Sequence, residues 1–168
     1  MKKTKDRYCR RAAALVAAGF LLAGCSDEPA EPLQPGEAEY VRYCSACHAR
    51  DGSGRPPTFP PLAGSEWLDL GPDAVSLIIL LGLRGEIEVA GRTYRGYMPT
   101  MRQLDDAEIK QILDHIDRQW ADWSQVPRVE DIATLRARTD EEPLLEGREP
   151  LERLLTTLDI ADSGEVTP

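Results

Sequence analysis

Cys44-Ser45-Ala46-Cys47-His48 is the stretch of sequence that decides the fold. Cys-x-x-Cys-His is the signature at which c-type haem is attached. Two cysteines at this spacing can add their thiols across the two haem vinyl groups, while the adjacent histidine reaches the iron. We therefore expect Cys44 and Cys47 to bind one haem covalently and His48 to ligate its iron.

Two other chemistries use the same residue types and fit less well. Cys44, Cys47, His48 and His115 could formally make a zinc set. Paired zinc ligands are usually two to five residues apart, whereas Cys47 and His48 are adjacent and His115 is distant. A thioredoxin-type pair would follow a strand within a βαβ pattern, and this pair follows a predicted helix instead.

The N-terminus has the features of a bacterial export signal. Six basic residues among the first eleven precede an apolar run at 12–23, which is shorter than the roughly 20 residues that span a bilayer. The run ends in Leu22-Ala23-Gly24-Cys25, which resembles a lipobox. Cleavage before Cys25 would leave this cysteine to carry lipid. An ordinary secretory signal that is cleaved nearby is the alternative.

Lipidation at Cys25 predicts a protein anchored on the periplasmic side of a bacterial membrane. This location agrees with covalent haem attachment, which takes place outside the bacterial cytoplasm. Removing residues 1–24 also removes Cys9, so Cys44 and Cys47 would be the other cysteines of the mature chain.

Charge restricts the classes of partner. The full chain has 20 Lys and Arg against 29 Asp and Glu, and without residues 1–24 it keeps 14 against 28, a net charge of −14. Such a chain should be repelled by nucleic acid and by anionic lipid headgroups. We expect redox partner proteins with either a basic docking surface or an apolar contact around the haem.

The chain divides into four segments. Residues 1–24 are the signal, 25–35 a proline-rich acidic linker, 36–123 the folded domain, and 124–168 a C-terminal extension. In the extension we expect a short helix at 129–138, followed by an acidic, partly disordered tail with one amphipathic patch at Leu151, Leu154, Leu155 and Leu158. The domain is small for a core made of protein alone, so a buried haem would supply the missing apolar surface.

Three helices are predicted inside the domain. The first opens near Gly36 and runs into Cys44, and the second is capped by Asp73, is apolar on nearly every side and stops at Gly85. Asp105 caps the third, with Glu108 at capping-box spacing. Its apolar face consists of Ile109, Ile112, Leu113, Ile116 and Trp120. Alternating residues at 86–91 allow a short β-hairpin.

The whole pattern resembles a class I monohaem cytochrome c. The resemblance is carried by the Cys-x-x-Cys-His motif, by Pro60-x-Leu62-x-Gly64, by a methionine beside Pro99 and by the closing helix. The strings F-P-P-L-A-G-S-x-W and G-x-x-Y-x-G-x-M-P are similar to those of cytochrome subunits of periplasmic quinoprotein and flavin-linked dehydrogenases. The fold implied is an all-α domain that wraps around one covalent haem c.

The resemblance also implies roles for single residues. The Pro60 carbonyl would accept a hydrogen bond from the His48 imidazole, and Met98 would be the distal iron ligand. Met101 is the alternative ligand, three residues later. Relatives usually have an aromatic residue near His115, which we therefore interpret as a packing residue. They often have glycine where this chain has Ala49.

Electron transfer without bond chemistry is the function that these features favour, so the protein is not expected to be an enzyme. Its partners would be a dehydrogenase, an oxidase or another cytochrome. An accessory haem subunit of a dehydrogenase or terminal oxidase complex, docked through residues 140–168, is the alternative. A haem with an open coordination site, acting as a peroxidase or gas sensor, ranks lower because the sequence offers no distal acid–base pair.

Overall fold

The structure of the protein is a computed structural model that describes residues 33–158. The predicted signal peptide, Cys25 and the linker as far as residue 32 lie outside the described residues, and so does the end of the tail at 159–168. Among the helices of the described part, none has the length and apolar character needed to cross a membrane.

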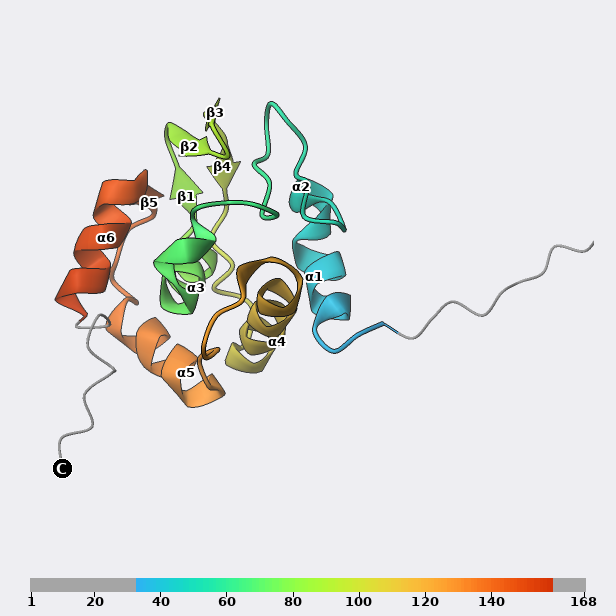
Figure 1. Ribbon diagram of the computed structural model, residues 1–168. Helices are drawn as coiled ribbons and strands as arrows, with labels where there is room; N and C mark the ends of the chain where they lie inside the picture. Colours follow the sequence, from blue (N-terminus) through green and yellow to red (C-terminus); the bar gives the residue numbers. More distant parts are fainter. Residues whose placement is uncertain (1–32, 159–168) are drawn as a thin grey trace, which may run out of the picture. The chain divides into compact units, whose positions relative to one another are not determined.

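Helices are the main secondary structure of the described residues, which confirms the expected all-α class. They are α1 (Glu37–Tyr43), α2 (Ser45–His48), α3 (Pro72–Leu81), α4 (Asp106–Ile116), α5 (Val129–Arg138) and α6 (Arg148–Thr157). A 3-10 turn at Leu68–Leu70 precedes α3, and a π-helical turn at Asp117–Ala121 extends α4. α3 lies between α4 and α6, while α1 packs against α4 (Figure 1).

The helix ends follow from local chemistry. Asp105 and Glu108 form the predicted capping box at the start of α4. At α3 the prediction of an Asp73 cap was wrong, because Gly71 occupies the cap position and the helix begins at Pro72, whose fixed φ suits a first turn. α3 also ends before the predicted Gly85. Gly82 follows its last residue with φ 76°, a left-handed conformation that an L-residue disfavours.

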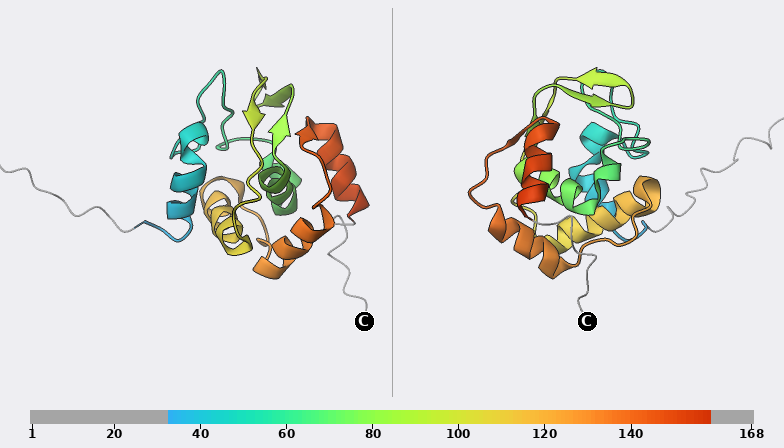
Figure 2. Two further views of the ribbon diagram at one scale, coloured as in Figure 1. Left: turned by 180° about the vertical axis from the view of Figure 1, so that it is seen from behind. Right: turned by 60° about the vertical axis from the view of Figure 1, so that its left-hand side comes forward.

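Short strands lie together at one end of the helices (Figure 2). β2 (Ile87–Val89) and β3 (Arg92–Tyr94) form the small hairpin that the sequence allowed. Ala90 and Gly91 have φ values of 50° and 70°, as the tight turns that match strand twist require. A second sheet has the order β4–β1–β5, from β1 (Leu83–Arg84), β4 (Tyr97–Met98) and β5 (Leu145–Glu146).

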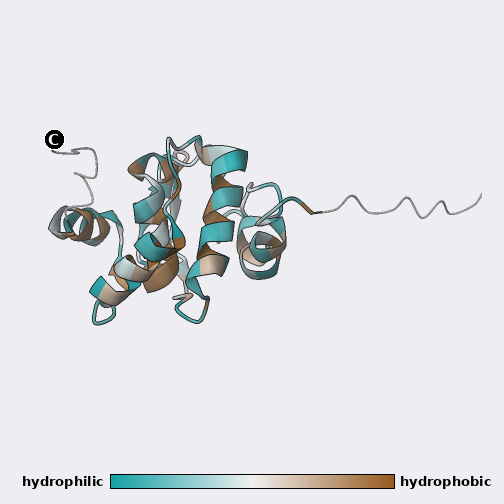
Figure 3. Cartoon of the chain, turned by 90° about the horizontal axis from the view of Figure 1, so that it is seen from below, coloured by the Kyte–Doolittle hydropathy of each residue, from teal (hydrophilic) through white to brown (hydrophobic). Residues whose placement is uncertain are grey.

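The core is centred on α3. Every residue from Ala74 to Leu81 is buried, as its apolar composition predicted. The other helices alternate polar and apolar bands along their ribbons (Figure 3), because each has one face toward the core and one toward solvent. α3 is therefore the element around which the remaining helices close.

The C-terminal extension differs from the expected acidic, partly disordered tail over residues 145–157. β5 pairs in parallel with β1, and α6 packs on α3 with Leu151 fully buried. The apolar residues of α6 recur at helical spacing, so the acidic composition of this segment lies on its solvent face. The predicted helix at 129–138 is present as α5.

Candidate haem-binding site

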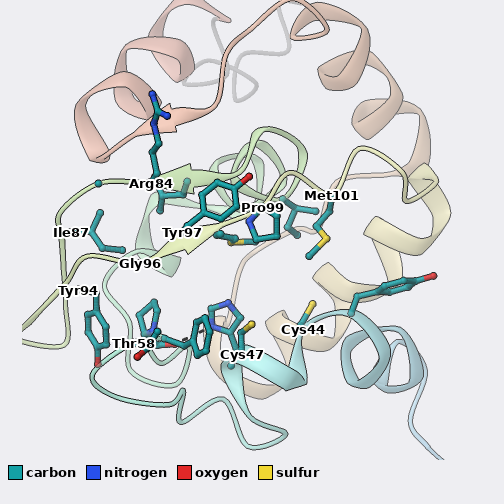
Figure 4. A pocket seen from close by; sticks show the side chains of 18 of the residues that line it. Cys44, Cys47, Thr58, Arg84, Ile87, Tyr94, Gly96, Tyr97, Pro99 and Met101 are labelled. Atoms are coloured by element: carbon teal, nitrogen blue, oxygen red, sulfur yellow. Dashed lines mark hydrogen bonds between the residues drawn. The ribbon is translucent and has the colours of Figure 1, made fainter.

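A cavity lies between the α1–α2 segment and strands β1 and β4 (Figure 4). It has two lobes, with empty volumes of about 840 and 660 Å³ including the open mouth. The lobes share Cys44, His48, Pro60, Ile79, Leu83, Ile87, Met98 and Ile112 as lining residues.

The two cysteines are placed by the junction of α1 and α2. Cys44 follows the last residue of α1, and its N–H donates to the Tyr40 carbonyl at 2.8 Å. Cys47 and His48 then donate their N–H groups to the Cys44 carbonyl at 3.1 and 2.9 Å. Both thiols are free and half-buried on the cavity wall. Burial raises the pKa of the Cys44 thiol to about 12, so this group is protonated at neutral pH.

The orientation of His48 is fixed by its proline partner. Its Nδ1 lies 3.0 Å from the Pro60 carbonyl oxygen, the contact that the family resemblance implied. Because a carbonyl oxygen only accepts, Nδ1 must carry the proton and Nε2 keeps a lone pair for a metal. Burial lowers the pKa of His48, which keeps the ring neutral as metal ligation requires.

The chain turns sharply after His48. Ala49 has φ 61°, so the left-handed turn forms although an alanine stands where relatives often have glycine. The Tyr40 hydroxyl donates to the Ala49 carbonyl at 2.7 Å, and the Gly54 N–H donates to the His48 carbonyl at 2.9 Å. These bonds hold the loop that brings Pro60 back to the imidazole.

Both candidate distal methionines line the cavity, but they are placed differently. Met98 is on β4, paired with Leu83, and lines both lobes together with His48. Met101 lines the larger lobe, and its sulfur accepts a hydrogen bond from the Gln103 amide at 3.3 Å. In Figure 4, Pro99 and Met101 lie on the side of the cavity opposite Cys44 and Cys47. The two thiols and the thioethers therefore face one cavity from two sides.

The residues of this cavity fit a covalently held haem. They provide two free thiols, an imidazole with a free lone pair, two thioethers and otherwise mostly apolar walls. Arg84 is the one formally charged side chain among the described lining residues. An apolar lining suits a porphyrin, which needs few polar contacts over its faces.

Comparison with known proteins agrees with this chemistry. A family model described as cytochrome c oxidase, cbb3-type, subunit III matches residues 31–116. Cytochrome c-552 of Thermus thermophilus is 39% identical over 110 residues, which cover 60% of this chain and 84% of that protein. A second cytochrome c-552 of the same species has the same identity and is covered over 74% of its length.

The chain belongs to this family of monohaem cytochromes c. As such it carries covalent haem c and exchanges electrons with redox proteins, and it is an electron carrier rather than an enzyme. The dehydrogenase subunits that the sequence also resembles do not appear among these matches.

His115 of this cytochrome lies away from the cavity. It is 4% exposed and packs against both Tyr40 and Trp120, at ring-centroid distances of 4.8 and 5.6 Å. Neither ring nitrogen has a hydrogen-bond partner among the described residues. The structure does not bring His115 to Cys44, Cys47 and His48, so these four residues form no zinc set.

The cavity walls contain residues that the sequence did not identify. Arg84 is one of these, and nothing in the sequence distinguishes it from the other arginines. Ile112 was predicted only as a core residue, yet it lines both lobes. The aromatic residues Trp67, Tyr94 and Tyr97 also line the cavity, whereas Arg92 is not among its lining residues.

Proposed function

We propose that Cys44 and Cys47 hold the haem by thioether bonds, with His48 as proximal and Met98 as distal iron ligand. The observation that carries the proposal is that these four side chains line one apolar cavity, with His48, Cys44 and Met98 bordering both lobes. Met101 borders the larger lobe and is engaged by Gln103, which makes it the weaker candidate.

The bound haem supplies one-electron chemistry between the ferric and ferrous states. The protein positions both ligands through its backbone: Pro60 orients His48, and β1 holds Met98. Because these groups are held independently of the haem charge, little rearrangement is needed when an electron arrives. The neutral Met98 thioether favours the reduced state, so a comparatively high reduction potential is expected.

The open-site alternative finds no support in the cavity. A peroxidase needs a distal acid–base group to move protons, and the described lining contains neither a carboxylate nor a second histidine. Electron transfer through a six-coordinate site therefore explains the residues better than peroxide or gas chemistry does.

The proposal for the whole chain adds an anchor and a partner. Residues 1–24 would be removed as a signal, Cys25 would carry lipid, and residues 25–35 would link it to the domain proposed at 36–123 on the periplasmic side of the membrane. The redox partner would be a membrane dehydrogenase, an oxidase or another cytochrome. The description of the matched family, a subunit of a terminal oxidase, favours an oxidase-linked role as the second candidate.

Maturation in a bacterium that attaches c-type haem tests this proposal. We expect haem to stay with the wild-type chain in denaturant, a single one-electron transition on redox titration, and recovery of the protein with membranes. A Cys44→Ser, Cys47→Ser double variant should release its haem in denaturant.

Cys25→Ser is the matched control, because it should keep the covalent haem and move to the soluble fraction. Covalent haem in the double variant would contradict the attachment proposal. Unchanged membrane association of Cys25→Ser would contradict the anchor alone.

A further inference from the structure

Met98 sits at one edge of a three-stranded sheet whose opposite edge is formed by the C-terminal extension. The register places Met98 opposite Leu83 of β1, and Leu83 opposite Leu145 of β5. β5 is fixed by the Leu145 N–H to the Gly82 carbonyl at 3.3 Å and by the Gly147 N–H to the Arg84 carbonyl at 2.9 Å. β5 therefore supports β1, and β1 in turn pairs with β4, the strand that carries Met98.

A second connection joins the same two parts of the chain on the other side of Met98. The Arg102 guanidinium donates to the carbonyls of Thr139 and Glu142 at 2.8 and 3.3 Å, and pairs with Asp140 at 3.3 Å. In return, Arg136 donates to the carbonyls of Arg102 and Leu104 at 2.9 and 2.7 Å. Leu104 is buried and lines the cavity.

The segment that carries both methionines has few supports of its own. Residues 97–104, the distal loop, contain only the two-residue strand β4. Otherwise the Thr100 hydroxyl donates to the Leu80 carbonyl at 2.6 Å, and the Met101 N–H to the Ile79 carbonyl at 2.9 Å. Strand pairs this short are marginal alone, so contacts from the extension are needed to define the loop.

We propose that residues 136–147, the C-terminal brace, position the distal methionine of this cytochrome, with Arg102 as the residue that links brace and loop. The inference rests on the proposed ligation by Met98. The brace lies beyond residues 31–116, which the family model matches, so it is an addition to that unit. The brace contacts β1, the strand that pairs with Met98, and Arg102, which follows Met98 in the chain. Releasing either contact should loosen the thioether while leaving the His48 side unchanged.

The test compares holoprotein variants of matched arginines. Arg102→Ala removes the link, Arg102→Lys keeps the charge but not the forked geometry, and Arg153→Ala removes an exposed ion pair of α6 that does not touch the brace. Three quantities are measured: the rate of carbon monoxide binding to the reduced protein, the reduction potential, and amide hydrogen exchange by mass spectrometry.

In Arg102→Ala we expect carbon monoxide to bind at least tenfold faster, the potential to fall, and exchange to accelerate at least tenfold in peptides covering residues 97–104. The α1–α2 peptides should keep their wild-type exchange. Arg102→Lys should be intermediate, and Arg153→Ala should equal wild type. If Arg102→Ala yields no holoprotein, Arg102→Lys and Glu146→Gln, which weakens the Arg84–Glu146 ion pair, are measured in the same way.

The inference would be overturned if the Arg102 variants bound carbon monoxide at the wild-type rate and residues 97–104 kept their wild-type amide hydrogen exchange. It would also be overturned if hydrogen exchange accelerated equally in all peptides, because that result indicates general destabilisation. Failure of the proposed function is distinguished by Met98→Ala. A wild-type spectrum in that variant would overturn the ligand assignment and the inference together, whereas normal Met98 ligation with an unaffected Arg102→Ala overturns the inference alone.

Discussion

Replacing His115 with phenylalanine should stabilise the protein. The neutral imidazole has one donor and one acceptor, and neither finds a partner in the described structure. Each buried polar group left unpaired costs about 1–3 kcal/mol. Phenylalanine removes both and keeps the aromatic contacts to Tyr40 and Trp120, but its larger ring must be accommodated. We expect a net gain of about 1–2 kcal/mol in the free energy of unfolding at pH 7.

The same substitution should also remove a pH dependence. Burial lowers the pKa of His115, and nearby Arg118 acts in the same direction while Glu37 opposes it. Below the unfolded pKa of about 6.5 the unfolded chain takes up a proton and the folded chain does not, so stability is lost as the pH falls toward the folded pKa. The slope for one group is at most about 1.4 kcal/mol per pH unit.

Urea unfolding of both holoproteins, followed by circular dichroism between pH 7.5 and 5, measures this effect. The carboxylates and His48 are common to both proteins, so the difference between the two curves isolates His115. We expect the advantage of His115→Phe to grow as the pH falls. A variant that is less stable at pH 7, with a slope equal to that of wild type, would refute the argument.

Three further substitutions test the packing around the site by urea unfolding. Leu77→Ala, at a fully buried position of α3, should cost about 2–5 kcal/mol, and a loss below 1 kcal/mol would show that α3 is not the centre of the core. Asp105→Ala should cost about 1 kcal/mol through the lost capping box, whereas Asp105→Asn, which keeps a side-chain oxygen to accept from the Glu108 N–H, should cost less; equal losses would contradict the capping role. Gly82→Ala should destabilise more than Gly91→Ala, because both have positive φ but only at Gly82 would a Cβ lie 2.7 Å from the Met98 carbonyl oxygen. Similar losses at the two glycines would contradict this close approach.

The sequence predicted those parts of the site that depend on residues close together in the chain. The spacing of Cys44, Cys47 and His48 follows from the size of a porphyrin edge, and the structure places all three on one cavity. The capping box at Asp105 depends on residues three apart in the chain. The contact between His48 and Pro60 was expected only from the family resemblance, since spacing alone does not bring that carbonyl to the imidazole.

The extension could not be predicted in the same way. β5 has two residues and exists because it pairs with β1. The paired residues Arg84 and Glu146 are 62 positions apart in the chain. The acidic, proline-containing composition of this segment favours a solvated tail, and long-range pairing overrides it. The role of Arg102 is likewise invisible in the sequence, because its partners are backbone carbonyls of a segment more than thirty residues away.

The visible spectrum of the oxidised and reduced holoprotein, with Met98→Ala and Met101→Ala measured beside it, tests the central claim most directly. We predict a low-spin, six-coordinate spectrum for wild type, an unchanged spectrum for Met101→Ala, and a high-spin spectrum that responds to carbon monoxide for Met98→Ala. An unchanged Met98→Ala spectrum, or a wild type that is already high-spin and binds carbon monoxide at once, would contradict a His48–Met98 electron-transfer haem.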